Sequence, residues 1–414
     1  MKVAGLFAGI GGLEVGLDRA GHRTVLLCEI DKAACEVLKK HFPEVPITED
    51  IHDLKRLPSE VELVAAGFPC QDLSQAGMTR GLNGTESVLV NEIFRLLKRK
   101  RTPHVLLENV SFMLHLHKGQ VLRYVIGRLE ELGYAWAYRV VDTRSFGIPQ
   151  RRERVFILAS QEIEPWRVLF KDDNPREEDR DHRGKACGFY WTEGSRGLGW
   201  AVDAIPTLKG GSSIGIPSPP AIWLPDGRIV TPDIRDAERL QGFEPDWTKP
   251  TEKLKRPGYR WKQVGNAVTV HVAEWLGNVI NSEPAWEPKR DIEFKDEGPC
   301  PKAAFGSKKG GRYRAEVSTY PVNSRMMPLG KYLEWEPYPL SAKATEGFIK
   351  RLKASSLSYP DEFLRDLERH LICMRAMVKA SPSCDRYEPS NTQVDYGHCI
   401  NRYSTIYSTR FTRF

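Results

Sequence analysis

The amino-terminal stretch has the pattern of a strand, a glycine-rich turn and a helix. This order limits the folds that the chain can adopt more than any other feature of its sequence. Residues 2–7 form an apolar run typical of a short buried strand, and the turn Phe7-Ala8-Gly9-Ile10-Gly11-Gly12 follows it. From Gly12 onward the apolar residues recur at helical spacing. Glycines let a backbone approach a ligand closely, and a helix amino terminus favours a negative group. The stretch therefore predicts an α/β fold with a doubly wound, mostly parallel sheet that opens on a nucleotide-type site.

Acidic residues follow the next two predicted strands. Glu29 ends the strand 24–28, where a carboxylate is placed to accept hydrogen bonds from ribose hydroxyls. Asp50 could read an adenine amino group, or it could be a simple turn or cap residue. These signs do not by themselves separate a dinucleotide from S-adenosylmethionine. The glycine turn disfavours NAD, because Glu14 stands where the G-x-G-x-x-G pattern has its third glycine.

A cysteine lies on a polar loop after the apolar run 61–66, which predicts a buried parallel strand. Gly67 and Pro69 end this strand, so Cys70 is expected at the carboxyl edge of the sheet, where ligands bind in open α/β folds. A lone cysteine is most often a small buried hydrophobe. A loop rich in proline and glycine is a poor place for core packing, which favours a nucleophilic thiol.

A carboxylate is expected at the same edge, and two arginines follow on a later strand. Glu108 ends the strand 104–107, and Arg152 and Arg154 point to one face of a later strand. Together with the thiol and the adenosyl-type pocket, they predict methyl transfer to carbon 5 of a cytosine. In this chemistry Cys70 adds to carbon 6, Glu108 assists at ring nitrogen N3, and the arginines position the base. A base within a duplex has to be flipped out to be reached.

In their order along the chain, these features resemble the cytosine-5 DNA methyltransferase family. The resemblance covers residues 1–160 and 205–280 and implies a Rossmann-like, S-adenosyl-L-methionine-dependent enzyme that methylates double-stranded DNA. The blocks that carry it are Phe7–Gly12, Glu29-Ile30-Asp31, Asp50-Ile51, Gly67–Gly77, Glu108-Asn109-Val110, Gln150–Arg154, Arg235–Phe243 and Gln263–Val268.

The resemblance also assigns roles to single residues. It makes Cys70 the nucleophile, and it places Gln71, Ser74 and Gln75 on a loop that closes over DNA. The residues that it implies for S-adenosyl-L-methionine binding are Phe7, Ala8, Gly9, Ile10, Gly11, Gly12, Glu29, Ile30, Asp50, Ile51, Pro69, Leu89, Asn266 and Val268.

Four regions are expected. Residues 1–160 form the catalytic and cofactor-binding domain, 161–234 a loop-rich insertion, and 235–280 the ninth and tenth blocks with a closing helix. Residues 281–414 form a smaller α+β extension, in which we expect target recognition because the insertion is short. Its basic, glycine-rich loop before a strand at 315–320 is expected to contact DNA through Lys308, Lys309, Arg312 and Arg314.

Composition fits this interpretation. The net charge of +7 permits a polyanionic partner, and no apolar run is long enough to span a bilayer. Eight scattered cysteines indicate reduced thiols and a cytoplasmic protein. The family resemblance implies that the enzyme is associated with the nucleoid in a prokaryote. No metal site is predicted, because the spacing of Cys373, Cys384, His398 and Cys399 matches no tetrahedral finger.

The family resemblance implies a monomer and allows for a cognate restriction endonuclease that acts separately. Three other interpretations stay open: a tRNA cytosine-5 methyltransferase, a DNA-binding relative without catalysis, and, more distantly, a nicotinamide oxidoreductase.

Overall fold

The computed structural model describes residues 1–69, 89–210, 219–295 and 297–380 of the chain. The chain divides into two compact units. Unit 1 consists of Met1–Gly147, Arg152–Glu177 and Ala267–Arg325, and unit 2 of Ile148–Arg151, Glu178–Asn266 and Met326–Phe414. Each unit is thus assembled from segments that are distant in the sequence.

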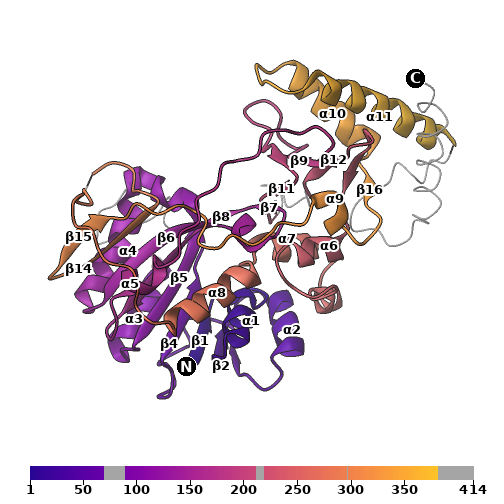
Figure 1. Cartoon of the computed structure of the whole chain (residues 1–414). Helices are drawn as coiled ribbons and strands as arrows, with labels where there is room; N and C mark the ends of the chain where they lie inside the picture. The colour runs from indigo at the N-terminus through magenta and orange to yellow at the C-terminus, as the bar shows by residue number, and fades with distance from the viewer. Residues whose placement is uncertain (70–88, 211–218, 296, 381–414) are drawn as a thin grey trace. The chain divides into compact units, whose positions relative to one another are not determined.

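A nine-stranded sheet forms the centre of unit 1 (Figure 1), in the order β15-β14-β6-β8-β5-β4-β1-β2-β3. The strands β3, β2, β1, β4 and β5 run parallel, β8 lies antiparallel between β5 and β6, and β14 lies antiparallel between β6 and β15. The predicted doubly wound, mostly parallel fold is therefore confirmed. The bounds are β1 (Lys2–Leu6), β2 (Arg23–Cys28), β3 (Ile47–Thr48), β4 (Leu63–Gly67), β5 (His104–Val110), β6 (Ala135–Asp142), β8 (Glu153–Ser160), β14 (Ala303–Ser307) and β15 (Gly311–Arg314).

Helices cover both faces of this sheet because its strands are apolar on both sides. In β4, Val64 and Ala66 pack into one core with α3 (Val90–Arg99) and α4 (Gln120–Glu131). Leu63 and Ala65 point to the opposite face and pack into a second core. The helices of that second core are α1 (Gly12–Arg19), α5 (Pro165–Leu169) and α8 (Val270–Ile280). The helix α2 (Lys32–His41) follows β2, and Asp31 caps its amino terminus.

The hairpin of β14 and β15 corrects one expectation. It extends the sheet of unit 1 beyond β6, and Phe305 packs its ring 5.3 Å from that of Trp166 and 5.4 Å from that of Trp286. Residues 281–325 consequently belong to unit 1, and the prediction of one separate domain over 281–414 is wrong at this boundary. The strand expected at 315–320 is also absent from these described residues, since the chain leaves the sheet after Arg314.

Unit 2 contains an antiparallel sheet in the order β10-β9-β12-β13-β16. Four of its strands come from the region expected to be a loop-rich insertion, and the fifth comes from the carboxyl-terminal part. The strands are β9 (Cys187–Phe189), β10 (Ala201–Val202), β12 (Ala221–Trp223), β13 (Ile229–Thr231) and β16 (Tyr338–Pro339), beside the short parallel pair β7 (Gln150–Arg151) and β11 (Ile205–Pro206).

The helices of unit 2 complete an α+β arrangement. They are α6 (Ile234–Arg239), α7 (Tyr259–Asn266), α9 (Leu329–Tyr332), α10 (Ala342–Lys353) and α11 (Asp361–Ala380). Figure 1 shows α10 and α11 alongside each other. Phe348 of α10 and Phe363 of α11 lie 5.1 Å and 5.0 Å, ring to ring, from Phe189 of β9, so an aromatic cluster joins both helices to the sheet. Within the described part of the chain, no helix is both long and apolar enough to cross a membrane.

Candidate active site

The turn between β1 and α1 has the backbone that its glycines require. Gly9 and Gly11 take φ values of +58° and +88°, and Phe7 takes +55°, which is unusual for a residue with a side chain. A Cβ on Gly11 would lie 2.8 Å from the ring of Phe42, so only glycine fits there. A Cβ on Gly9 would meet nothing within 4 Å, which leaves open space next to that residue.

Hydrogen bonds to the Glu29 carboxylate connect this turn to the end of β2. Its Oε2 accepts a hydrogen bond from the backbone N–H of Gly9 at 2.7 Å, and its Oε1 accepts one from the N–H of Asp31 at 2.7 Å. Because β1 and β2 are parallel neighbours, the turn after β1 and Glu29 after β2 lie at the same edge of the sheet. Burial raises the pKa of Glu29, and the hydrogen bonds from Asp31 and Gly9 oppose that rise.

The residues around the turn fit an adenosyl group. Ile30 is 70% exposed directly after Glu29 and offers an apolar surface. Asp50 accepts from the backbone N–H of His52 at 2.9 Å and from its ring Nδ1 at 2.7 Å, and these bonds lower the pKa of Asp50. Asp50 is thus an ionised acceptor that also closes a local turn. Its carboxylate and that of Glu29 can accept the hydrogen bonds that the hydroxyl and amino groups of an adenosyl ligand donate.

The other residues expected at the cofactor lie in different surroundings. Ile10, Gly12 and Ile51 are buried, Phe7 and Leu89 are half-buried against the core, and Ala8 is half-buried in the turn. Pro69 is exposed and ends a described segment. Val268 lies beside Gly67, since a Cβ on Gly67 would be 3.9 Å from its Cγ2. Asn266 belongs to unit 2, exposed at the end of α7 and close to Gly210.

Glu108, Arg152 and Arg154 meet at the carboxyl end of β5. Arg154 Nε lies 3.2 Å from Glu108 Oε1, with both side chains largely buried. The Arg152 side chain is buried, and its Nη2 donates to the carbonyl of Ala267 at 2.6 Å. Burial raises the pKa of Glu108, and the charges of Arg154 and Arg152 act in the opposite direction. The site therefore holds a carboxyl group with a raised pKa beside two guanidinium groups.

The strand that leads to Cys70 ends next to this carboxyl group. Gly67, the last residue of β4, pairs with Glu108 in the parallel ladder. A Cβ on Gly67 would lie 3.3 Å from Glu108 Oε2, so the lack of a side chain there leaves room for the carboxyl group. Cys70, Gln71, Ser74 and Gln75 lie outside the described residues.

Asn109 is a candidate site residue that the sequence analysis did not assign a role. Its buried Nδ2 donates to the carbonyl of Phe68 at 2.9 Å, and its Oδ1 accepts from the N–H of Val110 at 2.9 Å. This amide fixes the backbone two residues before Cys70. A polar amide within the otherwise apolar strand His104–Val110 was the signal that could have identified it.

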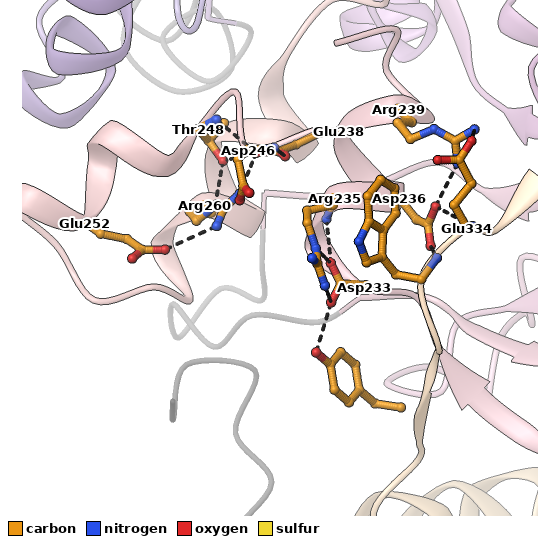
Figure 2. A network of polar contacts seen from close by, with 12 residues as sticks. Asp233, Arg235, Asp236, Glu238, Arg239, Asp246, Thr248, Glu252, Arg260 and Glu334 are labelled. Carbon is orange, nitrogen blue, oxygen red and sulfur yellow. Dashed lines mark hydrogen bonds and ion pairs between the residues drawn. The ribbon is translucent and has the colours of Figure 1, made fainter. Parts of the chain in front are cut away.

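The ninth block forms a polar network in unit 2 (Figure 2). The Arg260 guanidinium donates to Glu238 Oε1 and to Asp246 Oδ1, both at 2.9 Å, and Glu238 also accepts from Thr248. Asp236 accepts from the backbone N–H groups of Glu334 and Trp335 at 3.0 and 3.1 Å. The block therefore joins α6, α7 and the segment before β16, a structural role within unit 2.

The four cations expected to contact DNA lie on the hairpin of unit 1. Lys308 and Lys309 are exposed in its turn, and Arg314 is exposed at the end of β15. Arg312 instead forms an ion pair with Glu130, with Nη2 at 2.7 Å from Oε2. Cys373 is buried in α11, and no cluster of metal ligands occurs among the described residues.

Comparisons with known proteins show which family the chain is similar to. The family model for C-5 cytosine-specific DNA methylases matches residues 1–189. Type II methyltransferase M2.BsuMI of Bacillus subtilis (strain 168) is 47% identical over 390 residues, which cover 89% of this chain and 98% of that protein. Type II methyltransferase M.BanI of Aneurinibacillus aneurinilyticus is 42% identical over 164 residues, or 38% of each chain. The structure of the Entamoeba histolytica methyltransferase EhMeth aligns with a TM-score of 0.48 at 15% identity, over 68% of this chain and 97% of that one.

The extent of the match to M2.BsuMI decides the family, because it runs through both units rather than the catalytic blocks alone. The chain belongs to the C-5 cytosine-specific DNA methylases and is a DNA cytosine-5 methyltransferase that takes its methyl group from S-adenosyl-L-methionine.

Proposed function

We propose that the enzyme methylates a cytosine that has been flipped out of double-stranded DNA, through a covalent bond between Cys70 and carbon 6 of the base. The observation that carries this proposal is the cluster of Glu108, Arg152 and Arg154 beside Gly67, at the end of the strand that leads to Cys70. A catalytic carboxyl group, two cations and the approach to the thiol all meet at one edge of the sheet.

The thiolate of Cys70 attacks carbon 6, and the 5,6 double bond of the ring becomes a carbanion or enamine centred on carbon 5. Carbon 5 then takes the methyl group. Loss of the proton from carbon 5 and departure of the Cys70 thiolate restore the aromatic ring and free the enzyme. The covalent bond divides one difficult substitution into easier steps.

Glu108 acts on the opposite side of the base. Attack at carbon 6 builds negative charge at N3, and a protonated carboxyl group donates a hydrogen bond or a proton there. The burial that raises the pKa of Glu108 supports this role, since it favours the protonated form. Arg154 orients the carboxyl group through its ion pair, and Arg152 is held in place by the Ala267 carbonyl.

S-adenosyl-L-methionine supplies the electrophilic methyl group when bound. In our proposal Glu29 accepts from the ribose hydroxyls, Ile30 packs against the adenine, Asp50 accepts from its amino group, and the Phe7–Gly12 turn faces the methionine part. The exposed Ile30 and the open space beside Gly9 support this assignment. Pro69, Leu89 and Val268 would complete the site within unit 1, and the role expected for Asn266 of unit 2 stays a prediction.

Reading of the DNA sequence is assigned to unit 2. Both the insertion and the carboxyl-terminal segment contribute strands to its sheet, so in our proposal they provide the recognition domain together. The helices α10 and α11 and their connection, residues 342–380, carry eight Lys or Arg residues against five Asp or Glu, a balance that suits a polyanion.

Two proteins that are similar to this chain, M2.BsuMI and M.BanI, are Type II methyltransferases. We therefore place it in a restriction-modification system, acting as a monomer in the cytoplasm, where it protects DNA from an endonuclease that works separately. Its substrate would be duplex DNA rather than tRNA.

Bisulfite sequencing of DNA from cells that express the chain tests this function. We expect 5-methylcytosine at one position of one short sequence, and none in cells that express Cys70→Ser. Parallel sequencing of the tRNA pool provides the alternative outcome: methylation confined to tRNA, or an active Cys70→Ser variant, would overturn the proposal.

A further inference from the structure

The segment that follows β5 exposes an aromatic ring at the edge of the sheet that carries Glu108. Two short 3₁₀ turns, Ser111–Leu114 and Leu116–Gly119, follow β5 directly. Phe112 is 62% exposed in the first turn, whereas the neighbouring Met113 and Leu114 are buried and anchor the segment. The ring is thus displayed on a fixed backbone rather than on a loose loop.

The second turn has an unusual backbone. His117 and Lys118 have φ/ψ values of 48°/45° and 58°/33°, so two consecutive residues with side chains take the left-handed conformation. Such a conformation persists only where the surroundings impose it, and it occurs preferentially at functional sites. His115, His117 and Lys118 are exposed, and Lys118 gives this side of the turn a positive charge.

Hydrogen bonds with α4 and with the segment before β14 hold the turn in this conformation. Arg123 of α4 donates through Nη1 to the carbonyls of Lys118 at 2.8 Å and of Gly298 at 3.0 Å. The backbone N–H of Cys300 donates to the carbonyl of Leu114 at 3.0 Å. The turn is therefore held by α4 and by the segment before β14, all within unit 1.

The position of the turn relates it to the reacting groups. Val110, the last residue of β5, pairs with Arg154 of β8, and Arg154 contacts Glu108. The exposed turn thus begins directly after the residue that pairs with Arg154, the arginine in contact with the Glu108 carboxyl group. A duplex that presents a flipped base to Glu108 would have its neighbouring nucleotides close to this edge.

We infer that the turn 111–118 is a DNA-contacting surface, on which Phe112 packs against the nucleotide next to the extruded cytosine and Lys118 faces a phosphate. The inference rests on the proposed function. An apolar side chain that enters the space beside an extruded base stabilises the distorted duplex, as apolar wedges do in proteins that unstack base steps. A cation on the same turn fixes the register of the backbone.

The test uses the full chain and the variants Phe112→Ala and Phe112→Leu. A duplex that contains the target cytosine gives kcat/KM, and the same duplex with 2-aminopurine in place of that cytosine reports base flipping. We expect Phe112→Ala to lower kcat/KM for DNA by about tenfold or more and to reduce the fluorescence of the flipped base, because an apolar contact with the duplex is lost. Phe112→Leu should recover part of both signals. S-adenosyl-L-methionine affinity and thermal stability should not change in either variant.

Ile292→Ala is the matched control, since Ile292 is another exposed apolar side chain of unit 1, at 40% exposure. It should behave as wild type. Lys118→Asn removes the charge but keeps a residue that tolerates the left-handed conformation, so the salt dependence of binding should fall by about one counterion.

Wild-type kcat/KM and flipping in Phe112→Ala, together with an unchanged salt dependence in Lys118→Asn, would overturn the inference while leaving the proposed function intact. A wild-type chain that neither flips nor methylates the base would instead overturn the proposed function itself.

Discussion

Arg154 of β8 approaches Glu108 of β5 from the neighbouring strand, with Nε 3.2 Å from Oε1. The antiparallel pairing of β5 and β8 creates this contact, because it brings the start of one strand against the carboxyl end of the other. The charge of Arg154 lowers the pKa of Glu108, whereas burial raises it, and burial is the larger effect. The balance between them decides over which pH range Glu108 keeps a proton to donate.

Replacing Arg154 should move this range upward. In Arg154→Gln the opposing charge is gone, so the pKa of Glu108 rises further and the carboxyl group stays protonated to higher pH. We expect the alkaline limb of the pH profile of single-turnover methylation to shift to higher pH, although the maximal rate falls because the carboxyl group is less well positioned. Glu108→Gln serves as the control and should lose this limb altogether. An unshifted limb in Arg154→Gln would contradict the assignment.

Asn109 should matter through the backbone that it holds. Asn109→Asp keeps the acceptor for Val110 N–H but removes the donor to the Phe68 carbonyl, and Asn109→Ala removes both. The loss of a buried hydrogen bond costs about 1–3 kcal/mol. We expect slower adduct formation with DNA in both variants and unchanged S-adenosyl-L-methionine affinity, measured by single-turnover kinetics and calorimetry. Adduct formation at the wild-type rate in Asn109→Asp would show that the donor does not position the loop.

The Arg260–Glu238 pair should be needed for the stability of unit 2. Both side chains are almost fully buried, and their nitrogen and oxygen atoms lie 2.9 Å apart. Arg260→Gln leaves the fully buried Glu238 carboxylate without its cation, so it should lower the free energy of unfolding by about 3–5 kcal/mol. Urea unfolding followed by tryptophan fluorescence measures this loss. The exposed pair of Arg183 and Asp181 is the matched control, and Arg183→Gln should leave the unfolding curve unchanged.

Glu14 should make the stability of the chain depend on pH. Burial raises the pKa of this α1 carboxyl group to about 8, and it lies so close to Gly5 that a Cβ there would collide with it. Because the folded-state pKa lies above the ordinary value of 4.5, the contribution of Glu14 is fully present below that value and is lost as the pH rises through about 8. The loss amounts to at most about 1.4 kcal/mol per pH unit.

The glutamine of Glu14→Gln carries no charge at any pH. The free energy of unfolding of this variant should therefore fall less than that of wild type between pH 5 and 8, an interval of about three units. Glu131→Gln, at an exposed position on α4, should follow wild type. Parallel pH curves for wild type and Glu14→Gln would show that Glu14 ionises normally.

Local sequence patterns accounted for the catalytic half of the fold. The apolar runs that became β1, β2, β4 and β5 are buried on both faces, and a strand of that kind can be read from its own residues. Since parallel strands end at one edge, the expectation that Glu108 would lie on the same edge as Cys70 followed from topology alone, and Cys70 itself lies outside the described residues. The structure places Arg152 and Arg154 beside Glu108, while the roles of these residues stay predictions.

Pairings between distant segments could not be read in this way. The strand Ala303–Ser307 pairs with β6, and Tyr338–Pro339 pairs with β13, each across more than a hundred residues. The residues of neither strand indicate which strand it pairs with, because pairing depends on which sheet edge is available and on side-chain packing across that edge. For this reason the boundary at 281 and the strand at 315–320 were wrong. Arg312 shows the same limit, since its partner Glu130 lies on α4.

The most direct measurement is the mass of the complex trapped on duplex DNA that contains 5-fluorocytosine at the target position. There the fluorine cannot leave as the proton does, so the covalent complex persists. Our account predicts an adduct that resists denaturation, contains the transferred methyl group and maps to the peptide with Cys70, and it predicts none with Cys70→Ser. Cys28→Ser is the control and should form it normally, because burial raises the pKa of the Cys28 thiol to about 12. An adduct that maps to another residue, or full methylation by Cys70→Ser, would contradict the account.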